Sequence, residues 1–231
     1  MLMSFKWLRC LFEKRKHPDG VQEVYVLGKK LFSYDNSKSL RLKAFIVNKG
    51  SGNAISIRQR GNRKLHVCIY GNDNKVTIDA SNVFAARISI GTPDCPAYGC
   101  EVSIGEGTTS SNELFIILLE NGSHVRIGRD CMFSSDVVMY GSDPHSIINE
   151  DGRLLNIGRS IEIGDHVWIG QSCRILKNTA IPDNSIIGIG SIVTSRFDVP
   201  NSIIAGSPAK LVKSGINWDR RRPQQYMDAS H

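Results

Sequence analysis

The stretch Ile163-Gly-Asp-His-Val-Trp-Ile-Gly-Gln-Ser-Cys-Arg-Ile-Leu-Lys-Asn-Thr-Ala-Ile181 carries an aliphatic residue at every sixth position. The same spacing continues toward Asn201, so that the aliphatic residues of one phase are Ile163, Ile169, Ile175, Ile181, Ile187, Val193 and Val199. A helix would repeat apolar residues every three or four positions and a hairpin every two, so neither fits. A period of six fits a coil with three flat sides, in which each strand pairs with its equivalent one coil later. The stretch therefore predicts a parallel β-helix.

A second set of positions supports the coil, because mostly small residues recur four places after each aliphatic one. These are Val167, Cys173, Thr179, Ser185, Ser191, Phe197 and Ile203. Small residues of this kind fit the corners of a coil. Farther toward the N-terminus, from about Arg41, less regular strands are expected around the pairs Ile55 and Ile57, Val67 and Ile69, Val76 and Ile78, Ile88 and Ile90, Val102 and Ile104, and Val125 and Ile127.

The repeat is interrupted once, between residues 141 and 160, and resumes at Ile161. A loop inserted into a regular stack has no stacking reason to exist, and such loops commonly carry function. We therefore expect a β-helix over residues 41–205 with an inserted loop at 141–160, preceded by an extension over residues 1–40. Residues 206–231 are expected to form a C-terminal helix and tail, with the helix over about 208–217 capping the open end of the stack.

The composition and net charge of the chain limit the kinds of partner that it is expected to bind. The chain has 231 residues, a formal net charge of +7 and 7% aromatic residues. Because no recognisable nucleic-acid-binding fold accompanies the charge, a phosphate-rich cofactor is a better partner than nucleic acid. Residues 1–20 mix apolar and basic side chains, which predicts an amphipathic helix packed on the coil or on a neighbouring subunit; weak peripheral membrane contact is the alternative.

Neither a membrane span nor a secretion signal is evident, because no apolar run approaches the roughly 18 residues needed and no cleavage site follows the N-terminus. A cytoplasmic location is therefore expected. The cysteines show no C-x-x-C spacing and are expected to be free, buried thiols. They are Cys10, Cys68, Cys95, Cys100, Cys131 and Cys173.

Three motifs resemble those of the hexapeptide-repeat acyltransferases. Ile161-Glu-Ile-Gly-Asp-His-Val-Trp-Ile-Gly170 resembles the family's I-x-I-G-D-x-V-W-I-G segment. Ile187-Gly-Ile-Gly-Ser-Ile-Val-Thr194 and Ile204-Ala-Gly-Ser-Pro-Ala-Lys210 resemble its G-A-G-S-V-V-T-K and A-G-N-P-A-K signatures. The resemblance implies an all-β, left-handed parallel β-helix and a homotrimer, and it is strongest to the branch that O-acetylates sugars of bacterial surface glycans.

The inserted loop contains Ser142-Asp-Pro-His-Ser-Ile147, which resembles the D-x-H-x-I stretch of family acetyltransferases and implies that His145 is the catalytic general base. An imidazole with a pKa near about 6.5 can remove a hydroxyl proton at neutral pH, and a backbone N–H can stabilise the oxyanion. Asp143 is expected to orient this imidazole or to bind acceptor hydroxyls, or else to be only a turn residue before Pro144. Candidate contacts to a sugar or its phosphate are Arg153, Asn156 and, as a weaker candidate, Arg159.

The resemblance also implies acetyl-CoA as cofactor, bound between the coils of two subunits. Trp168 corresponds to the residue that borders the thioester; an aromatic filling the subunit contact is the other interpretation. Gln171, Ile189 and Thr194 match positions that contact the cofactor, and Lys210 matches a basic residue near the nucleotide phosphates. Two positions depart from the family: Ser195 replaces the usual lysine, and Ile189 replaces the common alanine.

The expected function is acetyl-CoA-dependent O-acetylation of a sugar hydroxyl. An N-acetyltransferase acting on a nucleotide-linked amino sugar would use the same base and remains open. A zinc carbonic anhydrase is a distant alternative, since His124, His145 and His166 are evenly spaced by 21 residues. However, His124 and His166 fall at turn positions that face solvent, and zinc ligands must converge.

Overall fold

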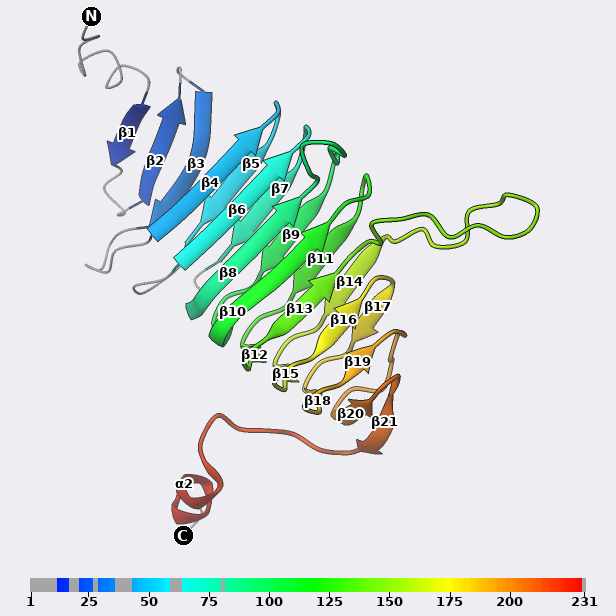
Figure 1. The fold of residues 1–231 in the computed structure, drawn as a ribbon. Coiled ribbons are helices and arrows are strands. Elements are labelled where there is room, and N and C mark those ends of the chain that lie inside the picture. Colours follow the sequence, from blue (N-terminus) through cyan, green and yellow to red (C-terminus); the bar gives the residue numbers. More distant parts are fainter. Residues whose placement is uncertain are drawn as a thin grey trace, which may run out of the picture.

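The computed structural model describes residues 12–16, 21–26, 29–35, 43–58, 64–79 and 82–229. These residues form a tall stack of parallel strands wound into a left-handed β-helix, with one short helix near the C-terminus (Figure 1). The predicted fold class is confirmed.

Two sheets share the strands. The first runs in the order β1 (Phe12–Lys16), β2 (Val21–Val26), β3 (Lys29–Asp35), β5 (Ala54–Ile57), β7 (Lys75–Ile78), β9 (Glu101–Ile104), β11 (His124–Ile127), β14 (Ser160–Ile163) and β17 (Thr179–Ile181). The second contains β4 (Lys43–Lys49), β6 (Lys64–Tyr70), β8 (Asn82–Ile90), β10 (Thr109–Leu118), β12 (Met132–Phe133), β13 (Val137–Tyr140), β15 (Trp168–Ile169), β16 (Arg174–Leu176), β18 (Ile186–Ile187), β19 (Ile192–Val193), β20 (Ser202–Gly206) and β21 (Ala209–Ser214). Strand β10 pairs with β12 near its start and with β13 near its end, which joins two faces of the coil.

The six-residue period becomes a coil of eighteen residues, because Ile163 pairs with Ile181 and Ile175 pairs with Val193. All aliphatic positions from Ile163 to Val193 are buried, which confirms the inward ladder. The prediction for Val199 is wrong, because this side chain is 40% exposed. The last coil is one residue shorter, pairing Ile187 with Ile204, so the register shifts and the aliphatic phase ends at Val193.

Small polar residues occupy the corners inside the coil. Thr179, Ser185 and Ser191 are fully buried, and each hydroxyl donates to a backbone carbonyl, as in the 2.6 Å bond from Ser191 to Gly188. At the last corner Ser202 is buried in place of the expected Ile203, because the last coil is one residue shorter than the others. Buried hydroxyls without partners would destabilise the fold, so these bonds explain why the corners accept them.

The buried cysteines Cys100, Cys131 and Cys173 are free thiols, as expected. Burial raises the pKa of Cys131 to about 12. Two cysteines depart from the prediction, because Cys95 lies exposed in a loop and Cys68 is only half-buried. Cys10 lies outside the described residues.

Both ends differ from the expectation. Phe12–Lys16 is strand β1, paired antiparallel with β2, so the amphipathic helix is wrong for these residues; residues 1–11 and 17–20 lie outside the described part. The element on the last coil is β21, antiparallel to β20, and the helix α2 begins only at Pro223 and ends at Asp228. Backbone pairing of β21 with β20 covers the strand edge of the last coil, which is the role that the predicted helix was expected to fill. Within the described ranges, no helix is long and apolar enough to cross a membrane.

A loop interrupts the coil in the predicted region, although Ser160, the last residue of the predicted loop, already belongs to β14. It leaves the coil after β13, which ends at Tyr140, and returns at β14, which begins at Ser160. Its chain doubles back through an antiparallel bridge between Ile148 and Leu154, and it projects from the stack as an arm (Figure 1). The same strand register continues on either side of it, because Tyr140 pairs with Leu176.

Candidate functional site

His145 lies at the base of the arm, five residues after the end of β13. Its side chain is exposed, whereas Ser142, where the loop begins, is buried and its hydroxyl accepts a hydrogen bond from the backbone N–H of Leu119. The imidazole is therefore open to a substrate on a backbone that is anchored to the previous coil.

A clasp of three side chains, Asp143, Asn156 and Lys177, holds the segment around His145. The Lys177 ammonium forms an ion pair with the Asp143 carboxylate, and this hydrogen bond lowers the pKa of Asp143 below its ordinary value. The Asn156 amide donates to the same carboxylate at 2.7 Å and to the backbone carbonyl of His145 at 2.8 Å. In return, the Asn156 side-chain oxygen accepts the N–H of Ile147 at 2.8 Å. The clasp fixes the backbone on both sides of the imidazole.

These contacts bear on the predicted substrate-binding residues. Asp143 and Asn156 use their polar atoms within the clasp, and among the described residues no hydrogen bond joins Asp143 to the His145 imidazole. Arg153 is exposed in the arm, where its backbone N–H is bonded to Asn149. A sugar-binding role for the three stays a prediction.

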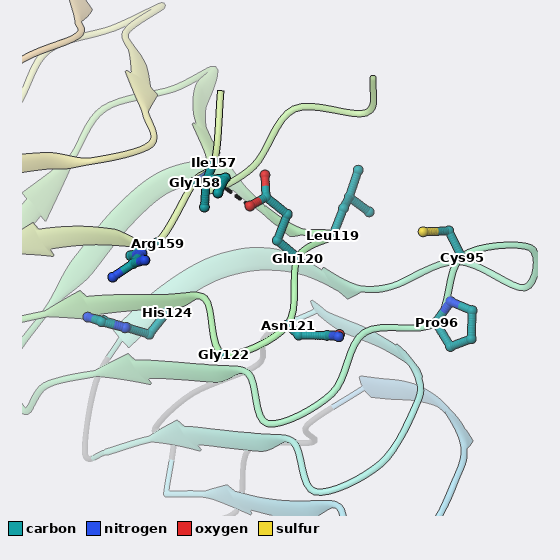
Figure 2. A pocket seen from close by; sticks show the side chains of 10 residues that line it. All are labelled: Cys95, Pro96, Leu119, Glu120, Asn121, Gly122, His124, Ile157, Gly158 and Arg159. Carbon is teal, nitrogen blue, oxygen red and sulfur yellow. Dashed lines mark hydrogen bonds between the residues drawn. The ribbon is translucent and has the colours of Figure 1, made fainter. Parts of the chain in front are cut away.

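The return of the loop is anchored separately. The Gly158 N–H donates to the Glu120 carboxylate at 2.8 Å, and the Asn178 side chain bonds the backbone at Arg159 and Ile157. A cavity of about 690 Å³ opens beside these contacts (Figure 2). Its walls are Cys95, Pro96, Leu119, Glu120, Asn121, Gly122, His124, Ile157, Gly158 and Arg159.

Part of the predicted cofactor set lies at another corner of the coil. Gln171 and Ile189 are stacked one coil apart, the Gly190 N–H donating to the Gln171 carbonyl at 2.8 Å. Trp168 is 36% exposed and Ile189 is 74% exposed, so both side chains are accessible to a ligand. Beside Trp168 a second cavity, of about 680 Å³, is lined by Ile186 and by the C-terminal residues Asn217, Trp218, Asp219, Arg221, Pro223, Tyr226 and Met227.

The C-terminal segment reaches this cavity because Trp218 packs against the coil. Its indole stacks on His166 with ring centroids 4.1 Å apart and donates to the His166 carbonyl at 2.8 Å. Arg220 adds a second contact between this segment and the coil, an ion pair with Asp130 at 2.8 Å. No motif in the sequence indicates the cavity that Trp218 helps to build.

The structure does not bring all the cofactor candidates together. Thr194 and Ser195 are exposed directly after β19, and the eighteen-residue register sets Ser195 beneath Lys177, at the corner where the loop leaves. Lys210 is exposed on β21. In Figure 1 the arm and β15, which begins with Trp168, lie on opposite sides of the coil, so His145 and Trp168 do not share one site within a single chain.

The other histidines have partners of their own. His124 bonds the Glu162 carboxylate at 2.6 Å, and His166 bonds Asp130 at 2.7 Å. Within the described part of the chain, no group of three histidine, cysteine or acidic side chains is arranged to hold a metal ion.

No family model matches the chain. It is 39% identical over 123 residues to a polysialic acid O-acetyltransferase of Neisseria meningitidis, a match covering 53% of this chain and 56% of the relative. A polysialic acid O-acetyltransferase of Escherichia coli O1:K1 is 33% identical over 124 residues, covering 53% of this chain and 39% of the relative. The crystal structure of the polysialic-acid-specific acetyltransferase NeuO superposes with a TM-score of 0.59 at 26% identity, covering 84% of this chain and 99% of NeuO. The chain is thus similar to bacterial O-acetyltransferases, and it shares its fold with NeuO.

The predicted resemblance to the hexapeptide-repeat acyltransferases is thereby confirmed. A third relative is the galactoside O-acetyltransferase of Escherichia coli K12, 31% identical over 134 residues, which cover 57% of this chain and 62% of the relative. The matched segments therefore span about half the length of these relatives.

Proposed function

We propose that this protein is an acetyl-CoA-dependent O-acetyltransferase that modifies a sugar hydroxyl of a bacterial surface glycan. The observation that supports this most directly is the similarity to polysialic acid O-acetyltransferases over 53% of the chain. The exposed histidine on an arm inserted into an otherwise regular coil is the second support. A capsule-type polymer is the acceptor class that the relatives' names suggest.

The cavity beside Trp168 suits the cofactor. Trp168, Ile186 and Trp218 give it an apolar wall that fits a pantetheine arm, and Arg221, which is paired with Asp219 at 2.9 Å, lines the same cavity. When bound there, acetyl-CoA would supply the activated acetyl group. Gln171, Ile189, Thr194, Ser195 and Lys210 are the proposed further contacts, with Ser195 offering a hydroxyl where the family offers a charge.

His145 is the proposed general base. Its imidazole would accept the proton of the sugar hydroxyl as that oxygen attacks the acetyl carbonyl, and then hold this proton for the departing thiolate. The clasp residues Asp143 and Asn156 would keep the backbone of His145 in position, because a displacement of about 1 Å can cost roughly a hundredfold in rate.

A homotrimer follows as part of the proposal. Since His145 and Trp168 lie on opposite sides of one coil, a complete site requires His145 from one copy and Trp168 from its neighbour. We propose that this assembly works in the cytoplasm, where acetyl-CoA is available.

The test is a thiol-release assay with acetyl-CoA against polysialic acid, methyl galactoside and a nucleotide-linked amino sugar. Release with a hydroxyl acceptor, yielding an acetyl product that mild alkali removes, supports O-acetylation. An alkali-stable amide formed only with the amino sugar would support the N-acetyltransferase instead. Stoichiometric zinc in the purified protein would revive the carbonic anhydrase alternative.

A further inference from the structure

The cavity in Figure 2 opens at the corner from which the arm leaves the coil. Gly158, in its wall, packs against the start of the loop so closely that a Cβ on Gly158 would come within 2.5 Å of the Gly141 carbonyl oxygen. Gly141 lies four residues before His145. The cavity therefore lies next to the base of the arm, and it shares no wall residue with the cavity beside Trp168.

The feature of this cavity that suggests a ligand is the guanidinium of Arg159. Its side chain is exposed and, among the described residues, makes no hydrogen bond or ion pair. By contrast, the arginines on neighbouring turns are matched: Arg129 with Asp165 at 2.7 Å and Arg174 with Asp136 at 3.1 Å. An unmatched guanidinium in the wall of a cavity is available to a ligand, and its planar fork suits a carboxylate or a phosphate.

The surrounding charges select between these anions. Glu120 lies in the same wall, and Glu162 bonds His124, another wall residue, at 2.6 Å. Glu162 is also paired with Arg126 at 3.5 Å. With Glu162 offset in this way, the cavity wall holds one cation, Arg159, and one carboxylate, Glu120, so its net potential is small and a singly charged group is accepted more readily than a dianion. The remaining wall offers Leu119 and Ile157, the latter 49% exposed, against which the face of a sugar ring can pack.

We infer that this cavity binds a carboxylated sugar residue of the acceptor chain, with Arg159 holding its carboxylate, while a neighbouring sugar presents its hydroxyl to His145. The inference rests on the proposed function and names the acceptor class as an acidic glycan. The Asn121 side chain, whose oxygen accepts the Tyr98 N–H at 3.0 Å, would have its amide hydrogens available to donate to a sugar hydroxyl.

Binding without turnover tests the inference. The His145→Ala protein, without acetyl-CoA, is titrated with polysialic acid, with the same polymer after reduction of its carboxyl groups, and with a glycerol-phosphate polymer. Adding Arg159→Gln should weaken binding of the carboxylated polymer about tenfold to a hundredfold, the effect of losing a charge-assisted hydrogen bond. Binding of the reduced polymer should not change.

Arg196→Gln is the matched control, because Arg196 is exposed on a different turn and its replacement removes the same charge. Equal weakening by both substitutions would overturn the inference, as would the absence of binding to the carboxylated polymer or tighter binding of the phosphate polymer. The readout is independent of acetyl transfer. Transfer to neutral sugars by the Arg159→Gln single variant would leave the proposed function intact even if the cavity binds nothing.

Discussion

At the scale of single residues, the contacts around His145 are the least regular part of the molecule. The histidine and its loop could be predicted, because a break is visible against a regular repeat. The clasp could not be read directly, since Lys177 lies 34 residues from Asp143. A signal existed all the same: Tyr140 pairs with Leu176, so the coil register sets Gly141 and the start of the loop above Lys177.

Replacing Lys177 by Met should lower kcat for acetyl transfer about tenfold and leave KM for both substrates nearly unchanged. The side chain is only 20% exposed and pairs with Asp143, so its loss loosens the backbone that carries His145 without touching substrate. Steady-state kinetics on the purified variants measure this. Lys213→Met, on the exposed strand β21, is the control; equal kcat in both variants would remove the positioning role from Lys177.

Acid should weaken the clasp. The pKa of Asp143 is lower in the folded protein than in the unfolded chain, chiefly because Lys177 bonds the carboxylate. The pair therefore stabilises the fold above the unfolded-chain pKa, and this contribution is lost as the pH falls through the lower, folded-state pKa. Thermal unfolding should thus show Asp143→Asn less stable than wild type at pH 7 and nearly equal to it at strongly acid pH. A difference that persists unchanged in acid would contradict this origin.

At the scale of elements, the hexads are predictable because each strand depends on its own six residues and on an identical neighbour. Prediction fails where that regularity ends. Val199 keeps the aliphatic phase but stands in a turn, because the last coil is one residue short. The segment after Pro208 pairs with a strand edge that no local pattern reveals. A helix was therefore expected where the structure has strand β21.

Two matched substitutions test this register. Val193→Ala should reduce the free energy of unfolding by about 2 kcal/mol, because two buried methyl groups are removed from a fully buried site. Val199→Ala, at the same hexad position but 40% exposed, should change it by less than about 0.5 kcal/mol. Denaturant unfolding of both variants measures these changes. Equal losses of unfolding free energy would indicate that Val199 is buried in the core and would contradict the shifted register.

At the scale of the whole molecule, the coil separates His145, the proposed general base, from Trp168, beside the proposed cofactor cavity. Sequence resemblance implied both roles, yet only the three-dimensional winding reveals that the arm and β15, which carry these residues, lie on different sides of the coil. The Arg159 cavity escaped prediction for a related reason, since its walls come from three successive turns that are distant in sequence.

Light scattering should therefore find a trimer, in which each copy completes its neighbour's site. Mixing inactive His145→Ala with inactive Trp168→Ala subunits during refolding should also restore part of the activity, because some sites then receive both native residues. A monomer with full activity would contradict the shared site.

The most direct test of the central claim is the rate of acetyl transfer to polysialic acid by His145→Ala, with His66→Ala as control. His66 is an exposed residue of β6, on a coil far from the arm. We expect a loss of at least about a hundredfold for His145→Ala, because a general base is then missing, and no loss for His66→Ala. Transfer by His145→Ala at the wild-type rate would contradict the claim.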